Sequence, residues 1–237
     1  MIALKVLHVS TGDSGGGAAR AAFRIHQALV SEGVSSRMRV LYKGSDDVRV
    51  IGGVRASLMG RVFGKLERHW IEYTRKGWET ENSVLHSFGQ ASAGLVDELN
   101  ASDADILNLH WISGMLSVAD IGRLTKPIVW TLHDMWAFCG GEHYAPDDLN
   151  ARFRTGYHVD NRPAGERGPD LNRRTWEAKR KAWDRQRFTI VGDSYWMAEC
   201  ARRSVLFLNS PIHTVHYPLE MERLWRPIPR DVARVAL

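Results

Sequence analysis

Residues 5–20 read KVLHVSTGDSGGGAAR, and they determine how the N-terminal part of the chain is built. The short apolar run at 4–10 predicts a buried β-strand, and a loop with four glycines at 12–17 follows it. At 18–32 the apolar residues recur at helical spacing, and a glycine comes directly after them. The alternating stretch at 37–42 predicts a second strand, so the order strand, loop, helix, strand indicates a βαβ unit.

The same alternation continues through the rest of the chain. Further strands are expected at 105–111, 127–133, 188–191 and 212–216, and helices at 95–99, 116–124, 173–186 and 196–203. Strands that alternate with helices are typical of a parallel sheet covered on both faces. The sequence therefore predicts an α/β fold with a doubly wound, mostly parallel, Rossmann-like sheet. The segment 140–172 has little periodicity, and a connection of that length is usually functional or disordered.

The composition sets the broad class of the protein. Of its 237 residues, 44% are hydrophobic and 25% are charged, which are ordinary values for a globular chain. The net charge of +5 permits anionic partners, but no nucleic-acid recognition motif accompanies it, so no nucleic acid is expected. Cys139 and Cys200 lie far apart, which argues against a disulfide framework or a cysteine-based zinc site. No apolar run suits a signal peptide or a spanning helix, so a cytoplasmic location is expected.

The glycine loop predicts an anion site, because it points backbone N–H groups and a helix N-terminus at one place. Gly12 and Gly17 have the spacing of a P-loop, but Ala18 and Ala19 stand where that motif needs Lys and Ser or Thr. Arg20 replaces the third glycine of the dinucleotide fingerprint. Neither nucleotide motif is complete. A tight turn that only lets the helix pack closely is the alternative, although three consecutive glycines favour a ligand near the backbone.

Histidines, tryptophans and short polar residues gather where the predicted strands end, and open parallel sheets bind ligands at that edge. They occur at 10–17, 108–111, 133–134 and 193–196. Tryptophan rings suit the apolar faces of a sugar, and the polar groups suit its hydroxyls. Core packing of each tryptophan and a structural role for the histidine at 133 are the alternatives. Adjacent residues at a strand end point apart, so His133 and Asp134 are not expected to form a dyad.

Five stretches resemble glycosyltransferase family 4 of the GT-B fold, and most closely its colanic-acid and exopolysaccharide enzymes. In family order they are KVLHVSTGDSGGGAAR (5–20), DILNLHW (105–111), PIVWTLHDMWAFCGGEHY (127–144), VGDSYWMAEC (191–200) and HTVHYPLEMERLWRPIPRDVAR (213–234). The last stretch resembles the family's crossing between its two domains. The resemblance spans nearly the whole chain.

The resemblance implies a retaining transferase that moves a sugar from a nucleotide-sugar to a glycan or lipid-linked acceptor in polysaccharide biosynthesis. No cofactor besides the donor substrate is implied. His133 would be the catalytic residue that contacts the transferred sugar, and the donor would be bound by Gly15, Gly16, Gly17 and Ser194. The acceptor would be bound by Asn108, His110, Trp111, Asp134 and Trp136. The alternative is a non-catalytic sugar-binding or regulatory half that needs a partner domain.

The sequence departs from the family's pattern at two points. Many relatives carry several cysteines in the loop after the HDMW motif, whereas this loop has none, so no metal is expected. The loop has other potential metal ligands without a fixed spacing, and they are Glu142, His143, His158 and Asp160. The donor domain's Glu-x7-Glu motif is also absent. We therefore expect an acceptor-side domain at 1–218, and at 219–237 a linker and the start of a missing donor-binding domain.

A stretch at 54–78 combines an apolar helical face with many Lys and Arg residues. This pattern suits an anionic membrane surface, where a lipid-linked acceptor would be found. The sequence thus raises a peripheral position at the inner face of the membrane as a second expected location. An ordinary surface helix whose apolar stripe packs on the core is the alternative.

Overall fold

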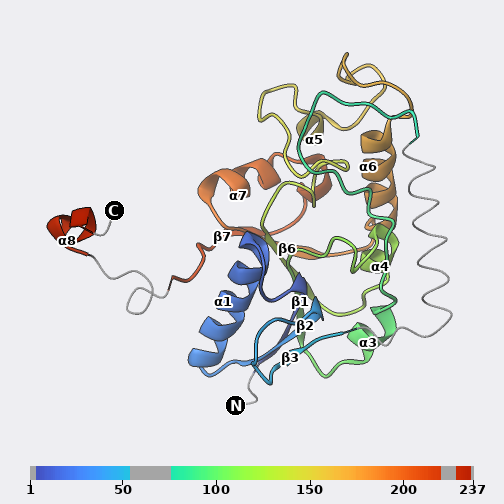
Figure 1. Ribbon diagram of the computed structural model, residues 1–237. Coiled ribbons are helices and arrows are strands. Elements are labelled where there is room, and N and C mark those ends of the chain that lie inside the picture. The colour runs from blue at the N-terminus through green and yellow to red at the C-terminus, as the bar shows by residue number, and fades with distance from the viewer. Residues whose placement is uncertain (1–3, 54–75, 220–227, 236–237) are drawn as a thin grey trace.

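The computed structural model describes residues 4–53, 76–219 and 228–235, and a parallel sheet forms its centre (Figure 1). Within these residues the sheet has seven strands in the order β3-β2-β1-β4-β5-β6-β7, and every neighbouring pair is parallel. The strands are β1 (Lys5–Gly12), β2 (Ser35–Tyr42), β3 (Val50–Ile51), β4 (Ile106–Leu109), β5 (Ile128–Leu132), β6 (Phe188–Gly192) and β7 (Ile212–Thr214). The predicted α/β fold with a doubly wound parallel sheet is confirmed.

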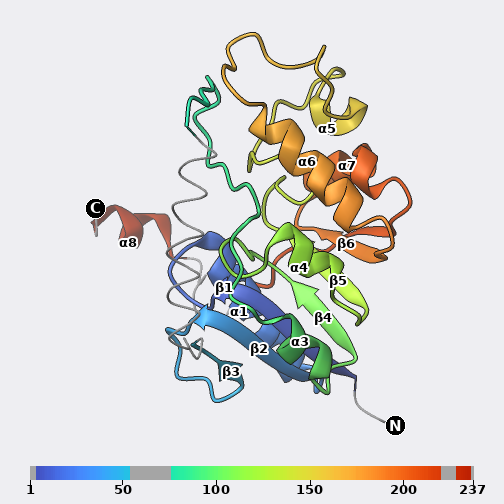
Figure 2. The ribbon, with the colours of Figure 1, turned by 90° about the vertical axis from the view of Figure 1, so that its right-hand side faces the viewer.

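Helices cover both faces of this sheet (Figure 2). Those described are α1 (Gly17–Ser31), α3 (Val96–Ala101), α4 (Val118–Gly122), α5 (Arg152–Thr155), α6 (Leu171–Ala182), α7 (Tyr195–Arg202) and α8 (Arg230–Val235), with a 3-10 turn at Val205–Phe207. Helix α1 packs on one face, and α3, α4 and α6 lie on the other (Figure 2). Strand β3 and helix α5 were not predicted, because such short elements leave no periodic pattern in the sequence.

Local contacts determine where several helices begin and end. Ser117 forms a capping box with Asp120 at the start of α4, and Asp170 caps α6 by accepting a hydrogen bond from the backbone. Helix α4 ends at Gly122, earlier than expected, where a Cβ atom would lie only 2.4 Å from the Ala182 carbonyl oxygen. The end of α4 and the end of α6 therefore approach so closely here that a side chain would not fit.

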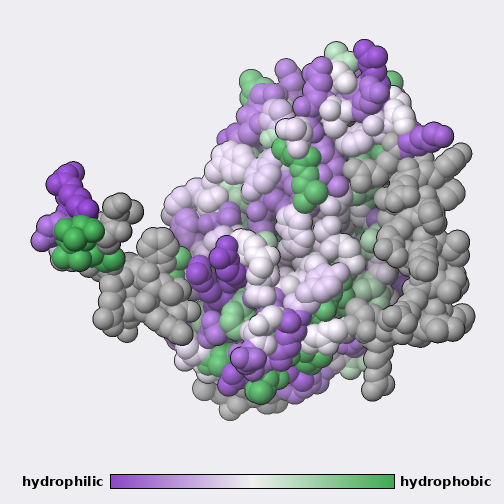
Figure 3. Space-filling view, in the orientation of Figure 1, coloured by the Kyte–Doolittle hydropathy of each residue, from purple (hydrophilic) through white to green (hydrophobic). Residues whose placement is uncertain are grey.

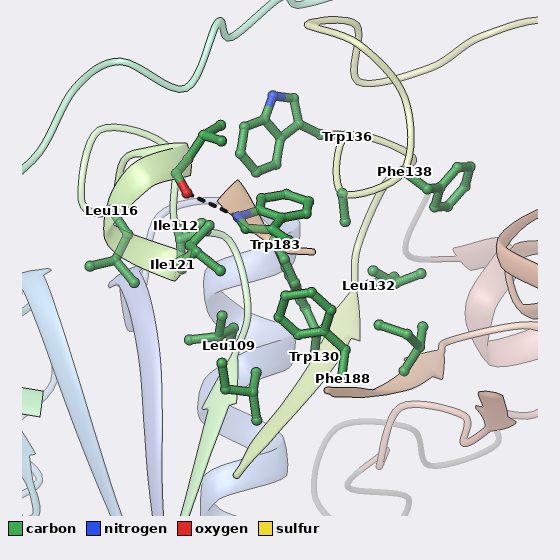
Figure 4. Packing of buried hydrophobic residues seen from close by; sticks show 14 of the residues in the cluster. Leu109, Ile112, Leu116, Ile121, Trp130, Leu132, Trp136, Phe138, Trp183 and Phe188 are labelled. Carbon is green, nitrogen blue, oxygen red and sulfur yellow. Dashed lines mark hydrogen bonds between the residues drawn. The ribbon is translucent and has the colours of Figure 1, made fainter. Parts of the chain in front are cut away.

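The larger hydrophobic core lies between the sheet and helices α3, α4 and α6, and tryptophans fill much of it (Figure 4). The Trp130 ring packs edge-on against Trp183 and Phe188, and it lies 6.2 Å from the ring centre of Trp136. The Trp183 indole N–H donates to the Val118 carbonyl at 2.9 Å, so its one polar atom is satisfied. For these tryptophans the core alternative is the one observed.

The face of the sheet beneath α1 is divided into an apolar part and a polar part. Over β2 and β3 most of the buried residues are apolar, and they are Ala22, Met38, Val40 and Val50, beside the buried and hydrogen-bonded pair His26 and Ser36. Over β1, β4 and β5 the buried residues are polar, and they include His8, Asn108, His110 and Thr131. Strands of a doubly wound sheet are normally apolar on both faces, so these polar groups need partners inside the protein.

Two sequence predictions concern parts of the chain that the structure does not describe or describes only in part. Most of the stretch 54–78 lies outside the described residues, and so does the segment 220–227 next to the expected domain boundary. Helix α8 lies apart from the sheet in both ribbon views (Figures 1 and 2). On the face shown in Figure 3, the hydrophobic residues that are described form small separate patches among hydrophilic ones.

Candidate functional site

The candidate site lies at the carboxyl edge of the sheet, between β1 and β4. The chain leaves β1 toward β2 on one side and leaves β4 toward β5 on the other, so the winding direction reverses between them. Ligands of open α/β sheets bind at such a switch point, because the two connections diverge there. The segments that meet at this edge follow β1, β4, β5, β6 and β7.

The glycine loop after β1 is open to a ligand. Gly15 and Gly16 have φ angles of 69° and 129°, and a Cβ atom on Gly15, Gly16 or Gly17 would have no neighbour within 4 Å. Helix α1 has no side-chain cap and no acidic residue in its first turn. In the described part of the chain, no hydrogen bond uses the three glycine N–H groups. Free amides at an uncapped helix N-terminus favour an anion.

Asp13 anchors this loop and does not face the open space. Its carboxylate accepts hydrogen bonds from Gly44 N at 2.7 Å and from the Ser45 hydroxyl at 2.5 Å. Burial alone would raise the pKa of Asp13, but the bonds from Ser45 and Gly44 outweigh burial and lower it. The carboxylate is therefore charged and fully engaged in holding the loop against the segment after β2.

Three histidines, which we call the histidine row (His8, His110 and His133), connect the layer beneath α1 to the carboxyl edge. His8 Nδ1 lies 2.8 Å from His110 Nε2, and His110 Nδ1 lies 3.0 Å from His133 Nε2. His133 Nδ1 lies 2.5 Å from the hydroxyl of Tyr217, and burial and then the nearby Asp193 raise the pKa of that hydroxyl. His133, Tyr217 and Asp193 are partly exposed, so the row opens at this end.

Burial keeps the histidine row uncharged. Burial and then the nearby His26 lower the pKa of His8 to about 3. Burial and then the other two members of the row lower the pKa of His110 well below its usual value. Burial lowers the pKa of His133 to about 4, although Asp134 and Asp193 act in the opposite direction. All three imidazoles are therefore neutral at pH 7.

In this arrangement the ring nitrogens of His133 are not free for the predicted catalytic role. Both of its ring nitrogens have partners within the protein, Nε2 in His110 and Nδ1 in Tyr217. A sugar could bond to a nitrogen of His133 only if Tyr217 moved away. Contact between His133 and a sugar stays a prediction, and the groups presented at the edge are those of Tyr217 and Asp193.

Asp134 belongs to a second hydrogen-bonded group. Its Oδ2 lies 2.7 Å from His143 Nδ1, and His143 Nε2 lies 2.9 Å from the Ser87 hydroxyl. The Ser87 hydroxyl also lies 3.0 Å from that of Ser113, and the Trp111 ring stacks on His143 with ring centres 4.5 Å apart. This group ties the segments after β4 and β5 to residue 87. As expected, Asp134 does not pair with His133.

The other predicted site residues divide into those at the edge and those in the interior. Trp111 is partly exposed and lines a small pocket together with His133 and Asp134. Trp136 is buried and its indole N–H donates to the Ser87 carbonyl at 2.6 Å, so it stabilises the core side of that pocket (Figure 4). Asn108 is buried beneath α1 and accepts a hydrogen bond from Thr131. The Ser194 hydroxyl caps α7.

No metal centre forms among the residues that the structure describes: no three His, Cys, Asp or Glu side chains there are placed to hold an ion. Three of the four loop residues considered as ligands have other partners. Glu142 accepts a hydrogen bond from the Tyr157 hydroxyl, His143 is held by Asp134, and His158 bonds to the Thr155 carbonyl. They do not converge on one point.

Sequence reasoning missed His8 and Tyr217 in this site. His8 lies in the opening stretch and looks like an ordinary member of a buried strand. The signal that could have revealed it is positional, because a polar residue inside a buried strand needs a hydrogen-bonding partner. The partners of His8 and Tyr217 come from other strands, which the local sequence does not reveal.

Comparisons with known proteins do not identify a family for this chain. No known protein family matches the chain, and no curated protein matches it. In the described part of the chain, no helix is both long and apolar enough to cross a membrane.

Proposed function

We propose that this chain forms the acceptor-side half of a retaining glycosyltransferase cleft, acting in polysaccharide biosynthesis on the cytoplasmic side of the membrane. The observation that supports it most is that an open glycine loop after β1 and a partly exposed Tyr217, bonded to the histidine row, lie at the same carboxyl edge of the sheet. The five stretches that resemble family 4 supply most of the segments at this edge.

In this proposal the glycine loop binds the diphosphate of a nucleotide-sugar. The free N–H groups of Gly15 to Gly17 and the N-terminus of α1 would stabilise the negative charge that grows on the departing diphosphate. A glycan or lipid-linked acceptor would lie over Trp111 and the mouth of the small pocket. By resemblance, a donor-binding half with the Glu-x7-Glu motif would form the opposite wall.

Calorimetric titration with a panel of nucleotide-sugars, free nucleotides and free sugars tests this proposal. We expect at least one nucleotide-sugar to bind, and Gly17→Ala to weaken that binding about tenfold or more, because the new methyl group occupies the open space over the loop. Another exposed loop glycine, Gly114, is unsuitable for a control, because its φ is 75° and an alanine there would strain the backbone. Ala119→Ser, on an exposed helix position, is the matched control and should bind as the wild type does. A chain that binds no member of the panel would overturn the proposal.

A non-catalytic sugar-binding half is the second candidate, and one observation favours it. Both ring nitrogens of His133 are engaged within the protein, so the histidine predicted to be catalytic is not free to transfer a proton to a ligand. The two candidates differ in a transfer assay in which a donor-binding half is supplied. Sugar transfer that depends on this chain supports the transferase, and binding without any transfer supports the second candidate.

A further inference from the structure

Helix α6 and the turn after it carry an excess of exposed positive charge. Between residues 174 and 187, five exposed side chains form no ion pair within the described residues, and they are Arg174, Arg180, Lys181, Arg185 and Arg187. Of the two acidic residues in this stretch, Glu177 is paired with Arg173 at 3.1 Å, and Asp184 is exposed. A cationic surface of this kind favours an anionic partner.

Two of these cations border an apolar groove between α4 and α6. The groove has a volume of about 650 Å³, and Arg174 and Lys181 line it. These two residues are seven positions apart, so they lie on nearly the same side of α6, about 10 Å from each other along its axis. Most of the other lining residues are apolar, among them Val118, Ala119, Leu171, Ala178 and Ala182. Within the described part of the chain, no acidic side chain lines the groove.

The groove is open to the outside of the molecule. Helices α4 and α6 pack against each other on the face of the sheet opposite α1 (Figure 2). Ala119 on α4 and Ala178 on α6 are exposed, so apolar surface lies beside the two cations. Arginine and lysine have apolar stems and charged ends, so they can cover apolar surface while their charge reaches an anion.

An anionic lipid matches both features of this surface. Its phosphate would pair with Arg174 and Lys181, and the upper part of an acyl chain would cover the apolar residues between α4 and α6. A nucleic acid would use the cations but leave the apolar residues uncovered, because its backbone meets proteins through phosphate and sugar. The lining of the groove therefore favours a lipid surface over a nucleic acid.

We propose that the groove between α4 and α6 docks the chain on an anionic phospholipid bilayer, with Arg174 and Lys181 on lipid phosphates. This surface uses other residues than the glycine loop and the stretch 54–78, and it does not depend on the sugar chemistry proposed above. Lys179, on the buried side of the same helix, donates to the Trp136 carbonyl. A membrane-bound α6 would thus be attached directly to the segment after β5, which borders the candidate site.

Sedimentation with vesicles, without any sugar present, tests the role of the charges. We expect the full chain to bind vesicles of equimolar phosphatidylglycerol and phosphatidylcholine but not phosphatidylcholine alone, and to bind more weakly as salt is raised. Arg174→Gln combined with Lys181→Gln should weaken this binding about tenfold or more, since each cation near an anionic surface contributes a factor of about five. Arg202→Gln combined with Arg203→Gln removes the same charge from exposed positions on α7 and should weaken it less than about twofold.

A fluorescent label tests whether the groove itself meets the lipid. Cys139 and Cys200 are buried, so Ala178→Cys can be labelled selectively with bimane. On the anionic vesicles, lipids that carry a nitroxide on the acyl chain should quench this label. A label on Ser31→Cys, at the exposed end of α1 on the other face of the sheet, should not be quenched.

Three results would overturn the proposal: no binding to the anionic vesicles, wild-type binding by the double variant at 174 and 181, or no quenching of the label at 178. If that double variant weakens binding to a DNA duplex and the chain does not bind vesicles, the surface belongs to a nucleic acid instead. The double variant should bind a nucleotide-sugar as the wild type does. Failure of this inference and failure of the proposed function are therefore distinguishable.

Discussion

Two neighbouring glycines in the loop after β1 differ in how well their backbone conformation accepts a side chain. Gly16 has a φ of 129°, which a residue with a side chain adopts only at a cost, whereas Gly17 begins α1 with ordinary backbone angles. Gly16→Ala should therefore lower the free energy of unfolding by about 1–3 kcal/mol. Gly17→Ala should leave it unchanged or raise it by up to about 1 kcal/mol.

Urea unfolding at pH 7 measures both effects, and each variant is the control for the other. Equal stabilities for the two variants would contradict the loop conformation described. The pair also separates folding from binding, since the second variant is expected to fold well and still lose affinity for a nucleotide-sugar.

Helix α6 holds the segment after β5 through one buried lysine. The Lys179 ammonium donates to the carbonyls of Trp136, Cys139 and Gly140 and lies 3.7 Å from the centre of the Trp136 ring. Burial lowers the pKa of Lys179 to about 7, although Cys139 and Glu142 act in the opposite direction. Lys179→Met leaves three carbonyls without a donor and should cost about 3 kcal/mol of stability.

Lys181→Met is the matched control, because Lys181 lies on the same helix and is exposed. It should change the free energy of unfolding by less than about 0.5 kcal/mol. If the two variants unfold at the same urea concentration, Lys179 does not hold the segment as described.

The histidine row joins β1 to the ends of β4 and β5, and it makes the stability of the fold depend on pH. The folded-state pKa values are about 3 for His8 and about 4 for His133, below the unfolded value near 6.5, so between these limits the unfolded chain binds more protons. Stability is therefore complete above pH 6.5 and falls as the pH decreases. Near pH 5 we expect a loss of more than about 2 kcal/mol per pH unit, since each histidine contributes up to about 1.4.

The free energy of unfolding measured between pH 7 and pH 4.5 checks this slope. His8→Gln removes one titrating group while keeping a side chain that can donate to His110. It should therefore reduce the slope by about 1.4 kcal/mol per pH unit, which is the contribution of one proton. If the free energy of unfolding stays constant from pH 6.5 to pH 5, burial does not lower the pKa values of the row, and this explanation of its neutral state is wrong.

The fold of the whole molecule could be predicted because its strands and helices have clear local patterns. The βαβ unit at the start and the later strands appear in the structure near their expected positions. The site could be predicted only in outline. Loops at strand ends can be placed from sequence, so Trp111 and His133 were expected at the edge, and both lie there.

The partners within the site could not be predicted, because they depend on the register between strands. His8 and His110 are 102 residues apart, and His133 and Tyr217 are 84 apart. Trp136 and Asn108 show the same limit from the other side. Their residue types suit a sugar, but Lys179 of α6 and Trp183 pack against the first, which is buried, and the contact with Thr131 holds the second beneath α1.

The central claim is that the carboxyl edge at the β1–β4 switch point is the ligand site. Titration of the 15N-labelled chain with the best-binding nucleotide-sugar, followed residue by residue through its backbone amides, tests this claim most directly. The account predicts the largest changes at Gly15, Gly16 and Gly17 and further changes near Asp193. Changes concentrated elsewhere, such as at the groove between α4 and α6, with the glycine amides unaffected, would contradict it.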